Sequence, residues 1–219
     1  MIGELLPETA VGVEAYGYEG ADTPLYPEEA AVLTRAVHKR RREFAVVRSC
    51  ARRAMEKLGV EPQPILPGER GAPGWPAGLT GSMTHCEGYC AAALVRVTDL
   101  ASLGIDAEVH APLPEGVLAS VSLPAEAGRL RRLAAERPDV HFDRLLFSAK
   151  ESVFKAWFPL TRKWLDFMEA DIELAADGTF RAELLVPGPW VGDRRLGHFD
   201  GRWTARGGLI ATAIAVPHA

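Results

Sequence analysis

Two neighbouring carboxylates follow a short apolar run at positions 103–109, where the sequence is LGIDAEV. In an extended strand, successive side chains point to opposite faces, so Asp106 and Glu108 share one face and lie about 7 Å apart. Two such carboxylates raise each other's pKa unless a cation lies between them, and their oxygens suit a hard ion such as Mg²⁺. The pair therefore predicts a metal site, and the alternative is an exposed, solvated strand face.

A glutamate and a lysine one helical turn apart form a second group, within the segment FSAKESVFKAW at 147–157. On a helix, Glu151 and Lys155 share a face, and a pair in this order stabilises an isolated helix by about 0.2–0.5 kcal/mol. The surrounding aromatic and apolar residues leave little polar surface around the pair. We therefore expect Glu151 and Lys155 to line a pocket, with an ordinary stabilising pair as the alternative.

A histidine beside two cysteines forms a third group, in and after the segment GSMTHC at 81–86. A lone histidine at a strand end is more often a structural hydrogen-bonding residue than a catalyst. A zinc site with Cys86 and Cys90 is a weak alternative, because Cys50 is distant in the sequence and no C-x-x-C pair exists. A Cys86 nucleophile with His85 as its base is also unsupported, since adjacent strand residues point to opposite faces.

The densest positive charge in the chain falls at 38–57, where HKRRR is followed by Arg48, Arg52, Arg53 and Lys57. Residues 28–58 contain neither glycine nor proline, and their apolar positions predict one helix that ends at Gly59. Its basic side is either a solvated helix face or an anion-binding surface. The net charge of −4 gives no general attraction to nucleic acid, so anion binding has to come from this local cluster.

Hydrophobic periodicity and turn residues predict the other elements. The proline-rich and glycine-rich segments 61–79 and 111–123 are expected to be loops, and the second is a candidate crossover. Alternating patterns predict strands, and patterns of 3.6-residue period predict helices. The strands are expected at 80–85, 89–97, 101–109, 171–174, 179–185, 198–205 and 209–216, and the helices at 124–137 and 142–158.

This order of elements predicts an α+β fold with two halves of similar plan. The first half, 1–110, would carry the basic helix and the paired carboxylates. The second half, 111–219, would carry the helix 142–158 and the closing strands. Each half combines a charged helix with a small sheet, which suits a pseudo-twofold pair with the active site in the cleft between the halves.

The composition is that of a folded globular protein, with 47% hydrophobic and 25% charged residues among 219. Three cysteines leave at least one unpaired and indicate a reducing compartment. The first ten residues carry Glu4 and Glu8 where a signal peptide would carry lysines and a long apolar run. No apolar stretch in the sequence approaches the roughly 20 residues of a membrane span. We therefore expect a cytoplasmic protein that does not bind membranes.

Four segments, in their order along the chain, resemble the motifs of one enzyme family. They are GAPGWP at 71–76, GSMTH at 81–85, GIDAE at 104–108 and FSAKE at 147–151, followed by Lys155. Each segment alone is a weak signal, but their order and spacing over residues 40–158 are specific. The chain therefore resembles the Sfp-type 4′-phosphopantetheinyl transferases, close to their EntD-like subgroup.

The resemblance implies an enzyme of the holo-[acyl-carrier-protein] synthase type. Such an enzyme transfers the 4′-phosphopantetheine group of coenzyme A to a serine of an acyl or peptidyl carrier protein and releases adenosine 3′,5′-bisphosphate. The family uses Mg²⁺, or Mn²⁺ in its place, and activates carriers of fatty acid, polyketide, nonribosomal peptide and siderophore biosynthesis. Serine attack on a phosphoanhydride needs a metal, a base and cations near the leaving phosphate, and the sequence offers each of these.

The resemblance also implies roles for particular residues. Asp106, Glu108 and Glu151 would hold the metal, and Glu151 and Lys155 would be catalytic. The residues that would bind coenzyme A are Arg40, Arg48 and His85 at the nucleotide phosphates, Lys150 and Lys155 at the pyrophosphate, and Arg53, Arg70, Thr84 and Asp106 around them. Related sequences often carry a lysine where this chain has Pro67, and Arg70 is the candidate to replace its charge.

Two other functions stay open as alternatives. A nucleic-acid-binding module would explain the basic segment and would lose affinity steeply with salt, but it gives no role to the acidic residues. A metal-dependent phosphohydrolase would use the same carboxylates to cleave a nucleotide pyrophosphate without a carrier protein. We expect a monomer whose partners are coenzyme A and carrier-protein domains, and not nucleic acid.

Overall fold

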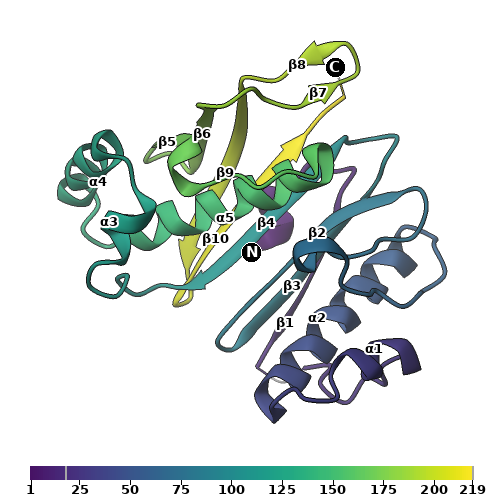
Figure 1. Ribbon diagram of the computed structural model, residues 1–219. Helices are drawn as coiled ribbons and strands as arrows, with labels where there is room; N and C mark the ends of the chain where they lie inside the picture. The colour runs from purple at the N-terminus through teal and green to yellow at the C-terminus, as the bar shows by residue number, and fades with distance from the viewer. Residues whose placement is uncertain (18, 219) are drawn as a thin grey trace.

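The computed structural model describes residues 1–17 and 19–218, which form two main antiparallel sheets, each with one long helix packed on it (Figure 1). The fold is α+β, which confirms the predicted class. In the view of Figure 1 the smaller sheet and α2 lie at the lower right, and the larger sheet and α5 lie above and to the left. Among the described residues, no helix is long and apolar enough to cross a membrane.

The smaller sheet has the strand order β1-β3-β2. Its strands are β1 (Val11–Tyr16), β2 (Leu79–Cys86) and β3 (Tyr89–Arg96). Helix α2 (His38–Lys57) packs its apolar side on this sheet. Of its basic residues, Lys39, Arg40, Arg41, Arg53 and Lys57 are exposed, whereas Arg48 and Arg52 are buried. Their shared core contains Val13, Ala15, Val46, Val47, Cys50, Ala51, Ala54, Met55, Ala92 and Leu94.

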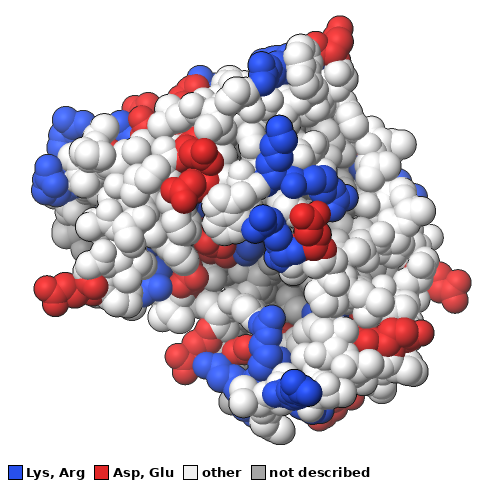
Figure 2. Space-filling model, in the orientation of Figure 1, with Lys and Arg blue, Asp and Glu red and all other residues white. Residues whose placement is uncertain are grey.

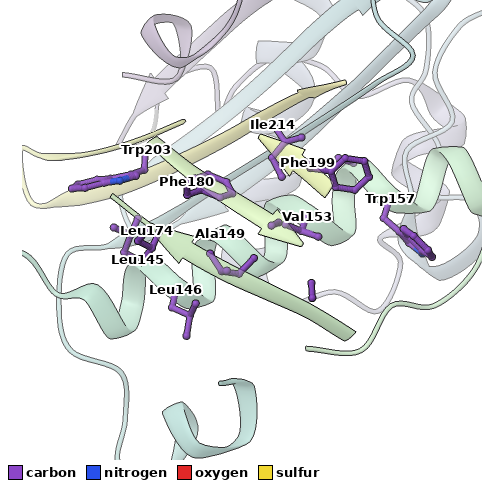
Figure 3. Close-up of a cluster of buried hydrophobic side chains, with 14 of the residues drawn as sticks. Leu145, Leu146, Ala149, Val153, Trp157, Leu174, Phe180, Phe199, Trp203 and Ile214 are labelled. Atoms are coloured by element: carbon purple, nitrogen blue, oxygen red, sulfur yellow. The ribbon is translucent and has the colours of Figure 1, made fainter. Parts of the chain in front are cut away.

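The larger sheet has the strand order β4-β10-β9-β6-β5. Its strands are β4 (Ser102–Val109), β5 (Ala170–Leu174), β6 (Thr179–Leu184), β9 (His198–Arg206) and β10 (Leu209–Val216). Helix α5 (Phe142–Thr161) lies across this sheet, and apolar side chains of the helix and the sheet meet in one cluster (Figure 3). Burial of each large side chain there contributes about 1.5–3 kcal/mol, which fixes α5 on the sheet. The cluster includes Leu145, Leu146, Val153 and Trp157 of α5 and Leu174, Phe180, Phe199, Trp203 and Ile214 of the strands.

Helix α5 comes unusually close to β4 at Gly104. A Cβ atom at this position would lie 2.1 Å from the carbonyl oxygen of Ser152 and 2.7 Å from the amide nitrogen of Ala156. The Ser102 hydroxyl donates to the Ala156 carbonyl at 2.7 Å and holds the same turn of the helix. The glycine of the GIDAE segment is therefore required by the packing of α5 on β4.

Gly104→Ala is expected to lower the free energy of unfolding by about 3 kcal/mol, because the added methyl group meets helix backbone and forces α5 to shift. Gly197→Ala is the matched control, since a Cβ atom there meets nothing within 4 Å, and its effect should stay within about 0.5 kcal/mol. Urea unfolding of both variants tests this, and equal stabilities would contradict the close packing.

The two main sheets meet where β2 runs beside β4 (Figure 1). Ser82 Oγ accepts the N–H of Ile105 at 3.0 Å, and Thr84 Oγ1 accepts the N–H of Ala107 at 3.0 Å. These bonds bring the segments GSMTH and GIDAE together. The predicted division after residue 110 put β4 in the first half, but the ladder of β4 with β10 makes it an edge strand of the larger sheet. The pseudo-twofold relation stays a prediction.

Residues 28–58 form two helices, so the prediction of a single helix is wrong. Helix α1 covers Pro27–Val32, and α2 begins at His38. Between them, the Arg41 side chain donates to the carbonyls of Thr34 at 3.1 Å and Ala36 at 3.0 Å. A side chain of α2 thus satisfies carbonyl groups that a continuous helix would have used internally.

Helix α4 (Pro124–Glu136), helix α5 and seven strands lie where they are predicted, within a few residues. Strand β1 is an addition to the prediction, and so is the short hairpin of β7 (Trp190–Val191) and β8 (Arg194–Arg195). Helix α3 (Val117–Val121) lies inside the segment expected to be a loop, which corrects that prediction. The remaining elements are the 3₁₀ turns η1 (Ile2–Leu5), η2 (Glu69–Gly71) and η3 (Phe167–Glu169).

Candidate active site

Asp106 lies on β4 at the junction with β2, and it is only 5% exposed. Its Oδ1 accepts hydrogen bonds from Thr84 Oγ1 at 3.2 Å and from Lys155 Nζ at 2.7 Å. Its Oδ2 is buried and has no hydrogen-bond partner among the described residues. A buried carboxylate oxygen without a partner costs free energy, so this atom is suited to receive a ligand from solution.

Glu151 and Lys155, one turn apart on α5, line the same pocket. Burial raises the pKa of the Glu151 carboxyl, the charge of Lys155 lowers it, and the charge of Asp106 raises it. The ammonium group of Lys155 contacts Asp106 directly. The structure therefore brings Asp106, Glu151 and Lys155 into one electrostatically coupled group, drawn from β4 and α5.

Glu108 lies two residues beyond Asp106 on β4, and it is paired with a cation. Arg144 NH1 lies 3.0 Å from Glu108 Oε2. Burial and the charge of Asp106 raise the pKa of the Glu108 carboxyl, and Arg144 lowers it. The sequence reasoning missed Arg144, although its position two helical turns before Glu151 on the same face of α5 is a signal. Over residues 1–17 and 19–218, no three His, Cys, Asp or Glu side chains are grouped as a preformed metal site.

The pocket beside Glu151 has a volume of about 670 Å³, and we call it the central pocket. It is lined by residues 68–75, by the first part of β2 and by the second half of α5. Arg70 belongs to its wall, with the guanidinium carbon 5.4 Å from the centre of the Trp164 ring. The φ angle of Arg70 is 53°, in the left-handed region that costs free energy for a residue with a side chain.

A second pocket, of about 350 Å³, lies between α2 and the end of β2 and shares Gly71 and Met83 with the central pocket. We call it the basic pocket, because Arg40, Arg48 and His85 line it. Thr84 and Pro67 are also part of its wall. Figure 2, drawn in the orientation of Figure 1, shows a hollow between the upper and lower parts of the molecule. Lys and Arg side chains lie on both sides of this hollow.

Arg48 is buried and held in place on two sides. Its Nε donates to the Ile65 carbonyl at 2.9 Å, and its guanidinium carbon lies 3.1 Å from the centre of the Phe44 ring. Burial lowers the pKa of Arg48 to about 10, so it is charged at neutral pH. Arg40 is exposed and contacts Nε2 of His85, whose pKa is lowered mainly by burial.

A third pocket, of about 110 Å³, shares Glu151 and Phe154 with the central pocket, and we call it the narrow pocket. Phe154, Leu165 and Phe167 give it a largely apolar lining. Lys150 also lines this narrow pocket, but its ammonium group lies 2.9 Å from Glu126 Oε2 and donates to the carbonyls of Phe167 and Ala170.

Three of the predicted binding residues line neither the central nor the basic pocket within the described part of the chain. Asp106 is connected to the two pockets only through its contacts with Lys155 and Thr84, and the other two are Lys150 and Arg53. Lys150 is buried against Glu126, so its ammonium group already has three acceptors. Arg53 is exposed and pairs with Glu19 at 3.5 Å. The sequence reasoning also missed Glu126, which comes from a different helix and carries no local sign of this contact.

The two cysteines near His85 do not have the properties of reactive thiols. Burial raises the pKa of Cys86 to about 12 and the pKa of Cys90 to about 12 as well. Both side chains therefore carry their proton at neutral pH, whereas zinc binding and nucleophilic attack require the thiolate. The arrangement gives no support to either cysteine alternative.

Two family models match the chain and together cover most of it. The model of the 4′-phosphopantetheinyl transferase N-terminal domain matches residues 28–95, and the model of the 4′-phosphopantetheinyl transferase superfamily matches residues 102–207. The chain belongs to the 4′-phosphopantetheinyl transferase superfamily, which confirms the resemblance of its motifs, and it is an enzyme of this transferase type.

Three curated relatives are similar over nearly the whole chain. The 4′-phosphopantetheinyl transferase Svp of Streptomyces mobaraensis is 61% identical over 220 residues, which cover 99% of this chain and 89% of that protein. Npt of Nocardia iowensis is 48% identical, covering 98% and 99% of the two chains. PptT of Mycobacterium tuberculosis is 44% identical, covering 99% and 98%.

Proposed function

We propose that this protein transfers the 4′-phosphopantetheine group of coenzyme A to a serine hydroxyl of an acyl or peptidyl carrier protein and releases adenosine 3′,5′-bisphosphate. The observation that carries the proposal is the group formed by Asp106, Glu151 and Lys155, in which Glu151 and Lys155 line the central pocket and Lys155 contacts Asp106. A phosphoryl transfer requires a metal ligand, a base and a cation. The group offers a carboxylate oxygen that has no hydrogen-bond partner among the described residues, a carboxyl of raised pKa and an ammonium group.

Mg²⁺, or Mn²⁺ in its place, fits the residues of this group. The buried Oδ2 of Asp106 lacks a partner among the residues described, and the pKa values of Glu108 and Glu151 are both raised, as expected for carboxylates that a cation would stabilise. Asp106, Glu151 and Glu108 would hold the ion. When bound, it supplies positive charge to the pyrophosphate oxygens of coenzyme A.

The basic pocket is suited to the nucleotide end of coenzyme A. Arg48 is fixed by its bond to Ile65, and Arg40 and His85 line the same pocket. Arginine binds phosphate oxygens through two parallel N–H donors, which gives both affinity and orientation. The pantetheine arm would then enter the narrow apolar pocket beside Glu151.

The roles in the transfer follow from these positions. Glu151 accepts the proton of the carrier serine, directly or through water, and its raised pKa makes it a better base. The serine oxygen forms a bond to the phosphorus that carries the pantetheine arm, and the bond from this phosphorus to the leaving adenosine 3′,5′-bisphosphate breaks. Lys155 orients Asp106 and places positive charge near the transferring phosphate.

The test is to incubate the protein with coenzyme A, Mg²⁺ and a carrier domain and to weigh the carrier by mass spectrometry. The proposal expects a carrier heavier by one phosphopantetheine group. Cleavage of coenzyme A with an unchanged carrier would instead support the phosphohydrolase. Tight, salt-sensitive binding to a random DNA duplex with no carrier modification would support the nucleic-acid-binding module.

Several further properties belong to the same proposal. All three cysteines, Cys50, Cys86 and Cys90, are free, which supports a cytoplasmic, reducing location. We propose that the protein acts as a monomer, without nucleic acid or membrane, on carriers of fatty acid, polyketide, nonribosomal peptide or siderophore biosynthesis. Arg70 takes the place of the lysine that related sequences often have at the position of Pro67.

Coenzyme A is expected to bind about 10–100 times more tightly than its analogue without the 3′-phosphate, because a hydrogen bond to a charged group contributes about 1.5–3 kcal/mol. Arg40→Ala should reduce this ratio. Arg53→Ala, outside the basic pocket, should leave it unchanged. Calorimetry of both ligands gives the ratio, and equal affinities in the unaltered protein would refute the assignment of the basic pocket.

A further inference from the structure

Two glutamates occupy equivalent places in the two halves of the protein. Glu29 is the third residue of α1, and Glu126 is the third residue of α4. Both helices begin with proline, both precede the long helix of their half, and both glutamates are fully buried. A carboxylate buried to this extent has to be compensated by the chain around it.

Glu29 is compensated by donors from three segments. Its Oε2 accepts the N–H of Tyr26 at 3.1 Å, and its Oε1 accepts the N–H of Ile65 at 2.9 Å. The guanidinium group of Arg52, on α2, pairs with Oε2. The carboxylate therefore connects the start of α1, the long helix of its half and a residue that follows that helix.

Glu126 is compensated by the corresponding three donors, whereas Glu29 has one further cation nearby, with Arg48 Nε 3.8 Å from its Oε1. Its Oε2 accepts the N–H of Leu123 at 2.6 Å, and its Oε1 accepts the N–H of Ile172 at 2.7 Å. Lys150, on α5, lies 2.9 Å from Oε2. Here the carboxylate connects the start of α4, the long helix α5 and the strand β5 that follows it.

Each carboxylate is connected by hydrogen bonds to the wall of a different pocket. Ile65, which Glu29 holds by its N–H, accepts Arg48 Nε with its carbonyl, and Arg48 lines the basic pocket. Lys150, which Glu126 holds, donates to the carbonyls of Phe167 and Ala170, and these residues line the narrow pocket with Glu151.

We propose that Glu29 and Glu126 are positioning residues with separate tasks, an inference that rests on the proposed function. Glu29 fixes the basic pocket for the nucleotide of coenzyme A, through Ile65 and Arg48. Glu126 fixes the narrow pocket for the pantetheine arm, through Lys150 and the segment 165–170. In this assignment Lys150 acts on the pocket wall and does not contact the pyrophosphate.

The two ligands of the test differ by the 4′-phosphopantetheine group, which is the arm together with its own phosphate. Adenosine 3′,5′-bisphosphate occupies the nucleotide site alone, whereas coenzyme A fills both sites. Glu29→Gln and Glu126→Gln keep the shape of each side chain and remove its charge, so each variant is the matched control of the other. Calorimetry gives the affinity of both ligands for the unaltered protein and for each variant.

Glu126→Gln should weaken coenzyme A about tenfold and leave the affinity for adenosine 3′,5′-bisphosphate within about twofold, because only the arm pocket changes. Glu29→Gln should weaken both ligands by the same factor, about tenfold. The ratio of the affinity for coenzyme A to the affinity for adenosine 3′,5′-bisphosphate therefore falls in Glu126→Gln and stays constant in Glu29→Gln. A ratio that is unchanged in both variants, or changed equally in both, would overturn the proposal.

Loss of one partner of a buried ion pair can prevent folding, so apolar pairs provide a second set of variants. Glu126→Leu with Lys150→Met, and Glu29→Leu with Arg52→Met, remove both charges of each of these pairs. Arg48, which is also 3.8 Å from Glu29, keeps its hydrogen bond to the Ile65 carbonyl. For each double variant we expect the same change in the ratio of the two affinities as for the corresponding glutamine variant. The same outcomes would overturn the proposal. An unaltered protein that binds neither ligand would overturn the proposed function, whereas normal binding without the difference between variants would overturn the positioning roles alone.

Discussion

Glu151→Gln is expected to lower the rate of transfer by about 10²–10⁴-fold and to leave the affinity for coenzyme A nearly unchanged. Glutamine has the shape of glutamate but cannot accept the serine proton. Burial and the charge of Asp106 raise the pKa of Glu151, so this carboxyl is a stronger base than an exposed one. Single-turnover kinetics with a carrier domain measure the chemical step separately from binding.

Two further variants are compared with Glu151→Gln, one as a control and one at the neighbouring lysine. Glu69→Gln changes an exposed carboxylate on the wall of the same central pocket, and its rate should be normal. Lys155→Ala should lower the rate more than the affinity, because its charge acts on the transferring phosphate. If Glu151→Gln shifted only the melting temperature and kept the rate, Glu151 and Lys155 would be an ordinary stabilising pair, and the active site would lie elsewhere.

Asp106→Asn is expected to reduce transfer by about 10³-fold and to abolish stimulation by Mg²⁺, because a metal ion supplies several kcal/mol of transition-state stabilisation. The oxygen of Asp106 that lacks a partner within the described chain is the atom best placed to bind the ion. The measurements are the Mg²⁺ dependence of the rate and the binding of Mn²⁺, followed by electron paramagnetic resonance in the presence of coenzyme A.

Glu108→Gln removes the second carboxylate of the proposed metal site, and its Mn²⁺ binding is compared with that of Asp106→Asn. Glu108 is already paired with Arg144, so loss of its charge should weaken Mn²⁺ binding less than Asp106→Asn does. Full Mg²⁺ stimulation of the Asp106→Asn variant, with unchanged Mn²⁺ binding, would remove Asp106 from the metal site.

Local sequence patterns predicted the parts of the site that lie on single elements. The alternation around Asp106 gave the correct strand, and the helical spacing of Glu151 and Lys155 gave one face of α5. The glycine of the GIDAE segment also has a structural role, because Gly104 has no Cβ atom and so leaves room for α5. Contacts within one strand or one helix depend on spacing alone, and spacing can be read from the sequence.

Contacts between distant segments could not be predicted in this way. Lys150 and Glu151 are adjacent in sequence but lie about 100° apart around a helix, and the direction of Lys150 depends on Glu126 in another helix. Strand β1 becomes visible as part of a sheet only through its pairing with β3, some 80 residues later in the chain. The break after α1 has no glycine or proline, and two carbonyl groups there accept hydrogen bonds from the Arg41 side chain, a contact that no local pattern indicates.

The most direct test of the central claim is to measure both products of one reaction, the modified carrier and adenosine 3′,5′-bisphosphate. A transferase in which Glu151 activates the carrier serine forms the two in equal amounts, and with a carrier whose serine is replaced by alanine it forms neither. We predict this one-to-one ratio for the unaltered protein with coenzyme A and Mg²⁺. Release of adenosine 3′,5′-bisphosphate in the absence of a modifiable serine, at the rate seen with the intact carrier, would contradict it.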